Sequence, residues 1–306
     1  MSELHKACEK RDLKRVTSLL SSKNVNTKNI YCETPLHVVS KHAHLDIVKV
    51  LVSREECDLN VPNEQGNTPL HTACKQILPA VVQFLVADPR CQLNIQNREG
   101  NTPLHTACKH GHHSTVKLLV ADQRCRLNVQ NNQGNTPLHT ACKRSHHSTV
   151  KLLVADQRCQ LNIQNGEGET PIHLASEYGR LDTVRVLLSK KECHLNIPDE
   201  RGNTPLHIAC MYSNYMYSIV QILTADQRCK LNTHNGEGKS PLHVASRRGD
   251  TDTVKILVNS EECNLNIVDN SGSTPMHIAC YMKKFSIIRL LLERRCGVSV
   301  STLCAF

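Results

Sequence analysis

The sequence predicts an all-α repeat protein, a linear solenoid of stacked helix-turn-helix segments joined by β-hairpin-like loops. The 306 residues include six Tyr, three Phe and no Trp, too few large side chains for the single core of a globular domain of this length. Each repeated segment encodes two short helices, which cannot stand alone in water and must pack on their neighbours. Leu-His or a close variant recurs with spacings of mostly 34 residues, at residues 4, 36, 70, 104, 138, 172, 206, 242 and 276.

One repeat, residues 101–135, illustrates how the helices are encoded. Thr102 is a good N-cap, and the Pro after it suits the first helical position, so we expect a first helix over Pro103–His110. Gly111 can end this helix in a left-handed conformation. Apolar residues at helical spacing then predict a second helix over Ser114–Ala121. Turn residues and a Gly close the repeat and predict a hairpin-like tip.

The segment Thr102-Pro103-Leu104-His105, with the Gly-His turn and the Leu-Leu second helix that follow it, resembles the ankyrin repeat. The same four residues recur from positions 34, 68, 136 and 204, and close variants start at 170, 240 and 274. The resemblance covers nearly the whole chain. It implies a non-enzymatic scaffold or adaptor that binds a protein partner, and it does not name that partner.

We expect a single array over residues 1–306. The first repeat is rich in charge, as a polar cap should be, whereas the last is a poor cap, which indicates a truncated array or a longer one. The repeats are expected at about 1–30, 31–64, 65–98, 99–132, 133–166, 167–200, 201–236, 237–270 and 271–306.

The sixteen Cys fall mainly at two repeated positions. Equivalent residues in stacked repeats are about 10 Å apart, beyond the roughly 7 Å that a disulfide spans, so we expect small buried apolar residues. Six follow the Ala of the first helix: Cys8, Cys74, Cys108, Cys142, Cys210 and Cys280. Eight follow the second helix: Cys57, Cys91, Cys125, Cys159, Cys193, Cys229, Cys263 and Cys296.

The histidines could suggest metal chemistry, since His105 precedes Cys108 by one helical turn. The resemblance instead implies that the histidines of the Leu-His pairs form hydrogen bonds that connect each helix start to a hairpin. His110, His112 and His113 begin a His-rich strip that could bind metal, but the ankyrin turn often carries His there. With no catalytic motif in the sequence, we expect no enzyme activity, catalytic residue, metal, cofactor or small-molecule substrate.

Charge and hydropathy limit the location. The net charge of +9 comes from 37 basic and 28 acidic residues, no apolar stretch could span a membrane, and residues 1–6 lack the apolar core of a secretory signal. We therefore expect a monomer in the cytoplasm, or in the nucleus.

Positions that vary between repeats are the candidates for binding a protein, which the basic residues suggest is an acidic segment. An aromatic and Met patch is expected from Tyr178, Met211, Tyr212, Tyr215, Met216, Tyr217 and Tyr281. A basic stripe is expected from Lys75, Lys109, Lys143, Arg144, Arg247 and Arg248. A second basic series on the outer helices, which includes Lys117, Lys151 and Arg185, is expected to face solvent.

Two other functions remain open. The chain could be the sensor or docking arm of a larger signalling protein or enzyme. It could also bind nucleic acid or an anionic membrane through its basic stripes, although its few aromatic residues do not alternate with basic ones as a base-stacking surface requires.

Overall fold

The computed structural model describes residues 2–21, 24–212 and 217–296. All regular structure in these residues is helical, and none of their helices is long and apolar enough to cross a bilayer.

The chain divides into two compact units, Met1–Gln160 (unit 1) and Leu161–Phe306 (unit 2). Unit 1 contains α1 (Glu3–Glu9), α2 (Leu13–Leu19), α3 (Pro35–His42), α4 (Leu45–Val52), α5 (Pro69–Lys75), α6 (Pro79–Ala87), α7 (Pro103–His110), α8 (His113–Ala121), α9 (Pro137–Arg144) and α10 (His147–Ala155). Unit 2 contains α11 (Pro171–Glu177), α12 (Leu181–Leu188), α13 (Pro205–Met211), α14 (Tyr217–Thr224), α15 (Pro241–Arg248), α16 (Thr251–Asn259), α17 (Pro275–Tyr281) and α18 (Phe285–Cys296).

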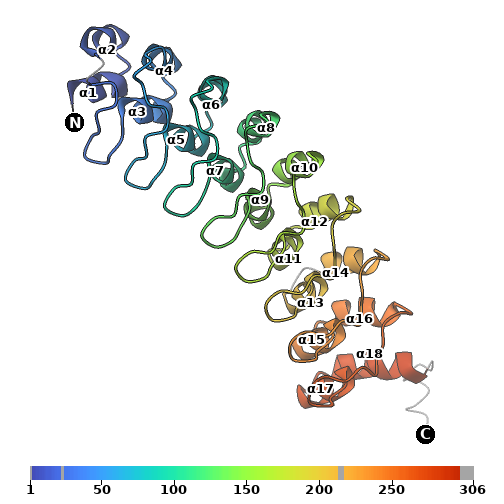
Figure 1. Ribbon diagram of the computed structural model, residues 1–306. Coiled ribbons are helices and arrows are strands. Elements are labelled where there is room, and N and C mark those ends of the chain that lie inside the picture. Colours follow the sequence, from blue (N-terminus) through green and yellow to red (C-terminus); the bar gives the residue numbers. More distant parts are fainter. Residues whose placement is uncertain (1, 22–23, 213–216, 297–306) are drawn as a thin grey trace. The chain divides into compact units, whose positions relative to one another are not determined.

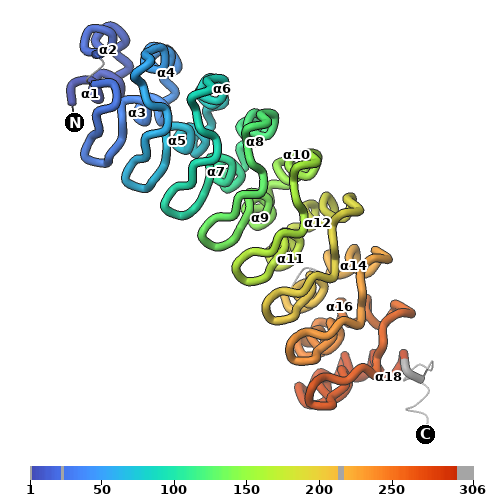
Figure 2. The backbone as a smooth tube through the Cα atoms, viewed as in Figure 1, coloured from blue at the N-terminus to red at the C-terminus, as the bar shows by residue number. Residues whose placement is uncertain are grey.

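Within each unit the helices form two rows. In unit 1 the first helices of successive repeats pack side by side, from α1 to α9, and the second helices form a parallel row from α2 to α10 (Figure 1). The loops between repeats project from the row of first helices, on the side away from the second helices (Figure 2). Unit 2 repeats this arrangement with α11 to α17 and α12 to α18. The predicted all-α repeat solenoid is confirmed.

The first helices start and end as their sequence predicts. At the start of α7, the hydroxyl of Thr102 accepts the backbone N–H of His105 at 3.4 Å. At its end, Gly111 is left-handed, with φ of 69°. The expected helix Pro103–His110 is confirmed, and α8 begins at His113, one residue before the expected start.

Four repeats keep the left-handed turn without glycine. The residues there, Arg11, Ala43, Ser145 and Lys283, have φ values of 56°, 63°, 68° and 53°, at a cost of about 1 kcal/mol each in backbone strain. The repeat with Ile77 avoids this conformation, because Gln76 is extended and Pro79 starts α6.

The loops between repeats are tight turns organised by asparagine. The side-chain oxygen of Asn97 accepts the N–H groups of Glu99 and Asn101, at 3.0 and 2.9 Å. Gly100 is left-handed, with φ of 75°. The N–H of Asn132, in the next tip, donates to the carbonyl of Glu99 at 3.1 Å. Successive tips are thus joined through their backbones.

Most cysteines are small core residues. Fourteen cysteines have described side chains, which do not include that of Cys296; these fourteen are free, and eleven of them are buried. Burial raises the pKa of Cys125 to about 12, so its thiol stays protonated. The expectation of burial is wrong for Cys280, which is exposed, and for Cys263, which is half-buried. Both lie near the end of unit 2, and α17 has no later first helix against it among the described residues.

Candidate functional site

The Leu-His histidines connect repeats and are structural. At the start of α7, the backbone N–H of Thr102 donates to Nδ1 of His105 at 3.1 Å. The ring proton is therefore on Nε2, which donates to the carbonyl oxygen of Asn135 at 2.9 Å. The ring is buried, and this burial lowers the pKa of His105 to about 4. Equivalent bonds to the next repeat are made by His37, His71, His173, His207 and His243. The predicted tie between helix start and hairpin is present at these positions.

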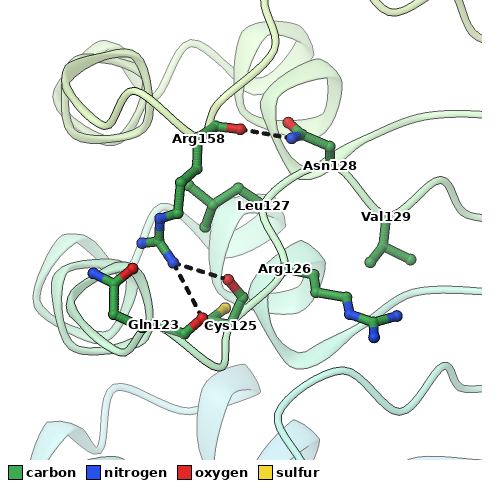
Figure 3. A pocket seen from close by; sticks show the side chains of 7 residues that line it. All are labelled: Gln123, Cys125, Arg126, Leu127, Asn128, Val129 and Arg158. Carbon is green, nitrogen blue, oxygen red and sulfur yellow. Dashed lines mark hydrogen bonds between the residues drawn. The ribbon is translucent and has the colours of Figure 1, made fainter.

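A second link between repeats is an arginine in the loop after the second helix (Figure 3). The guanidinium of Arg158 donates to the carbonyls of Val120, at 2.6 Å, and Cys125, at 3.3 Å, both in the preceding repeat. Asp156 fixes the guanidinium through Nε and Nη2, at 3.0 and 2.7 Å. Arg90, Arg124 and Arg228 make the same kind of clamp. The arginine covers the last carbonyls of a helix, which have no partner within that helix.

We expect Arg158→Lys to lower the free energy of unfolding by about 1 kcal/mol, because one ammonium cannot reach the carbonyls and the carboxylate together. The side chain is 30% exposed, so solvent screening keeps the effect modest. Urea unfolding followed by circular dichroism measures the change. Arg126→Lys is the matched control, because Arg126 extends away from the clamp (Figure 3); equal losses for the two variants would contradict the role of the clamp.

The hollow beside this clamp recurs between repeats. A cavity of about 420 Å³ is lined by the loop residues 123 and 125–129 and by Arg158. Figure 3 shows these side chains. A cavity of about 430 Å³ lies at the equivalent position one repeat earlier, beside Arg124. Because this cavity recurs at equivalent positions of successive repeats, it follows from the repeat fold and does not mark a specific binding site.

A different cavity lies along the first helices of unit 2. It has a volume of about 390 Å³, and its walls include Met211 at the end of α13, Val244 in α15 and Met282 just after α17. The loop residues Asn235, Glu237 and Lys239 and the helix-end residues Arg247 and Arg248 complete the lining.

A neighbouring cavity of about 750 Å³ shares Glu237 and Lys239 with the first and adds Ile278 and Tyr281. We call the two cavities together the unit 2 groove. It runs between the loop tips and the row α13, α15 and α17.

The groove has a small excess of positive charge. Its two cavities are lined by three basic side chains, Lys239, Arg247 and Arg248, and by two carboxylates, Glu237 and Asp269. Glu237 forms an ion pair with Lys239, which holds its pKa below the usual range, and Arg247 adds to this effect. The groove therefore combines an apolar floor with excess positive charge.

The structure brings together part of the expected patch. Met211, Arg247 and Arg248 line one cavity, and Tyr281, at 85% exposure, lines the other. Tyr178 and Tyr212 end α11 and α13.

The hydroxyl of Tyr212 is electrostatically coupled to its surroundings. Burial is the main cause that raises the pKa of Tyr212. The carboxylate of Glu177 raises this pKa further, and Tyr178 raises it by a smaller amount. Tyr217 begins the outer helix α14 and lines neither cavity, and Tyr215 and Met216 lie outside the described residues.

The remaining basic residues of the stripe are in unit 1. Lys75, Lys109, Lys143 and Arg144 are exposed at the ends of α5, α7 and α9. The other two residues of the expected stripe, Arg247 and Arg248, lie in unit 2.

Sequence reasoning missed the floor of the unit 2 groove. Val244 and Ile278 directly follow the Leu-His or Met-His histidine of their repeats. This position is Thr in α5, α7 and α9 but Leu, Ile or Val in α11, α13 and α15. Aligning the repeats at this one position would have revealed the change from polar to apolar.

The His-rich strip holds no grouped ligands. His110 and His112 stack with ring centroids 5.5 Å apart, and His112 Nε2 lies 3.1 Å from the carbonyl oxygen of Lys75. Within the described part of the chain, no three His, Cys, Asp or Glu side chains are placed to hold a metal ion.

The family model described as ankyrin repeats (three copies) matches residues 4–97, 78–165, 146–233 and 210–302. No curated protein matches the chain. Ankyrin repeats are generally protein–protein interaction modules, and the fold is typically non-catalytic. Since the matched ranges overlap and extend from residue 4 to residue 302, the chain belongs to the ankyrin-repeat family.

Proposed function

We propose that the protein is a non-enzymatic scaffold that binds a segment of a partner protein in the unit 2 groove. The observation that carries this proposal is the cavity of about 390 Å³ between Met211, Val244 and Met282, with three basic side chains at its edge. Met adapts its shape to different apolar side chains, and Arg forms strong paired hydrogen bonds with carboxylates. The loop tips form the second wall.

The composition of the groove favours an acidic segment with apolar anchors. Two residues at the equivalent position of their repeats, Val244 in α15 and Ile278 in α17, line the two cavities. Apolar floor residues supply affinity by burying the partner's side chains. The excess charge from Arg247 and Arg248 speeds the approach of an acidic partner and disfavours a basic one.

Affinity capture with quantitative mass spectrometry tests this function. The groove variant is Met211→Ala/Arg247→Ala/Met282→Ala in the full chain. We expect recovery of the specific partner to fall by about tenfold or more, because these substitutions remove both anchor contacts and a charge contact.

The matched control is Arg185→Ala/Lys255→Ala, on the outer helices α12 and α16, where both side chains are exposed. This variant should recover the same partner as the unmodified protein. A partner that is retained by the groove variant and lost by the outer-helix variant would place binding elsewhere and reject the proposal.

A further inference from the structure

Unit 1 carries a surface that is repeated without change in three consecutive repeats. The pentapeptide His-Thr-Ala-Cys-Lys occupies residues 71–75, 105–109 and 139–143 in α5, α7 and α9. Within each helix the Thr and the Lys are three residues apart, so they share one face. The lysines are exposed and the threonines are half-buried.

The equivalence of the repeats shows which way this face points. Val244 and Arg247 of α15 line the unit 2 groove, and they hold the positions that Thr and Lys hold in the pentapeptide. The Thr and Lys side chains of unit 1 therefore border the corresponding space between the first helices and the loop tips. We call the six residues Thr72, Lys75, Thr106, Lys109, Thr140 and Lys143 the Thr-Lys row.

The Thr-Lys row differs chemically from the unit 2 groove. Its floor is polar: the hydroxyl of Thr106 donates to the carbonyl of Thr102 at 3.4 Å, which leaves its oxygen able to accept a hydrogen bond. Thr72 and Thr140 make the same bond, each at 3.3 Å. This floor offers hydroxyl groups in place of an aliphatic surface.

The charge of the row is positive. The row carries three ammonium groups, and a carboxylate oxygen of Glu99 lies 3.9 Å from Nζ of Lys109. Both side chains of this pair are largely exposed, so the pair is weak and open to competition. Lys41 of α3 is also exposed, but Val38 stands at the Thr position of that repeat, so only the line of lysines continues.

The spacing of the row matches an extended peptide. Helices packed side by side are about 8–10 Å apart, and α5, α7 and α9 pack in this way. A polyproline II chain has three residues per turn and rises about 3.1 Å per residue, so every third side chain lies on one face, about 9 Å from the last. Successive lysines can thus meet successive carboxylates without distorting such a chain.

We propose that the Thr-Lys row binds an extended acidic segment with a carboxylate at every third residue, one tripeptide per repeat. The Thr-Lys row shares no residue with the unit 2 groove, and its role does not depend on the function proposed for that groove. A duplex nucleic acid is the alternative occupant, and the test below includes it.

The test uses the full chain and a fluorescein-labelled peptide of four Glu-Pro-Ala tripeptides, followed by fluorescence anisotropy at about 50 mM salt. The comparison peptide has the same composition with its four Glu contiguous. We expect the periodic peptide to bind about fivefold more tightly. The variant Lys75→Gln/Lys109→Gln/Lys143→Gln should weaken its binding by about tenfold, as three exposed ion pairs of modest strength would.

The matched control removes the same charge from the same unit. Lys49→Gln/Lys117→Gln/Lys151→Gln changes exposed residues of α4, α8 and α10 and should leave binding within about twofold. Circular dichroism checks that both variants are folded. The Met211→Ala/Arg247→Ala/Met282→Ala variant should bind the peptide normally, so a failure of this inference is distinguishable from a failure of the proposed function.

Four outcomes would overturn the inference. Equal weakening by the two lysine variants, or equal affinity for the two peptides, would mean that only net charge is sensed. Tighter binding of a DNA duplex of about 20 base pairs, lost in the Thr-Lys row variant, would assign the surface to nucleic acid. Equal binding of a helical peptide with Glu at every seventh residue, a spacing of about 10 Å, would reject the extended conformation.

Discussion

Lowering the pH from 7 to about 4.5 should unfold the protein, because its buried histidines are neutral in the folded state. Burial lowers the pKa of His71, His105, His173 and His207 to about 4, whereas the ordinary value is about 6.5. Each ring contributes stability that is fully present above pH 6.5 and is lost as the pH falls toward 4. The shift corresponds to about 3 kcal/mol per ring, or of the order of 10 kcal/mol for the four, as much as the whole stability of a typical domain.

The hydrogen bonds explain why the rings resist protonation. In the repeat of α7, Nδ1 of His105 accepts the backbone N–H of Thr102. A proton on Nδ1 would lie against the backbone N–H of Thr102 and would break the hydrogen bond at the start of the helix. For His71, the nearby His37 and His105 rings further oppose a positive charge. Protonation therefore favours the unfolded chain at each of these sites.

Urea unfolding at several pH values, followed by circular dichroism, measures this dependence. Near pH 5 the free energy of unfolding should fall by about 5 kcal/mol per pH unit, which corresponds to about four protons taken up on unfolding. The exposed rings of His113 and His147 are the controls, and their replacement by Gln should leave the profile unchanged. Constant stability from pH 7 to 5, with loss only below pH 4, would assign the acid sensitivity to carboxylates instead.

The helices of each repeat could be predicted from local residues, but the contacts between repeats could not. Thr102, the Pro after it and Gly111 determine the bounds of α7 through capping and backbone preference, which act over a few residues. Arg158 acts over a longer range, because its partner carbonyl belongs to Val120, 38 residues earlier. The recurrence of Asp-x-Arg-Cys was visible in the sequence. Its partners were not, because backbone carbonyls carry no sequence signal.

The candidate site was predicted in part for a related reason. Met211, Arg247 and Arg248 occupy helix ends beside the loops, and the structure places them in one cavity. Tyr217 was grouped with them because it follows closely in sequence, yet it begins an outer helix. The repeat that contains Tyr217 is longer than the others, so periodicity does not determine where its second helix begins. Proximity in sequence is a poor guide to proximity in space at such an insertion.

The loop tips offer the second large effect on stability. We expect Gly238→Ala to lower the free energy of unfolding by about 3 kcal/mol, from left-handed strain of about 1–2 kcal/mol and the forced separation of two tips. Gly238 has φ of 73°, and a Cβ there would lie 2.6 Å from the backbone nitrogen of Asn270. That nitrogen donates to the carbonyl of Glu237 at 3.2 Å, and this hydrogen bond joins the two tips. The clash would therefore break the hydrogen bond between the tips.

Gly272 is the matched control within the same unit. It has φ of 72°, but a Cβ there would meet no atom within 4 Å, so Gly272→Ala should cost only the strain, about 1–2 kcal/mol. Because repeat arrays can unfold in parts, urea unfolding should be combined with hydrogen exchange at the Asn270 amide. Exchange there should accelerate in Gly238→Ala by more than in Gly272→Ala. Equal losses of stability and equal exchange in the two variants would mean that the tips move apart freely, and that the contacts between helices alone hold adjacent repeats together.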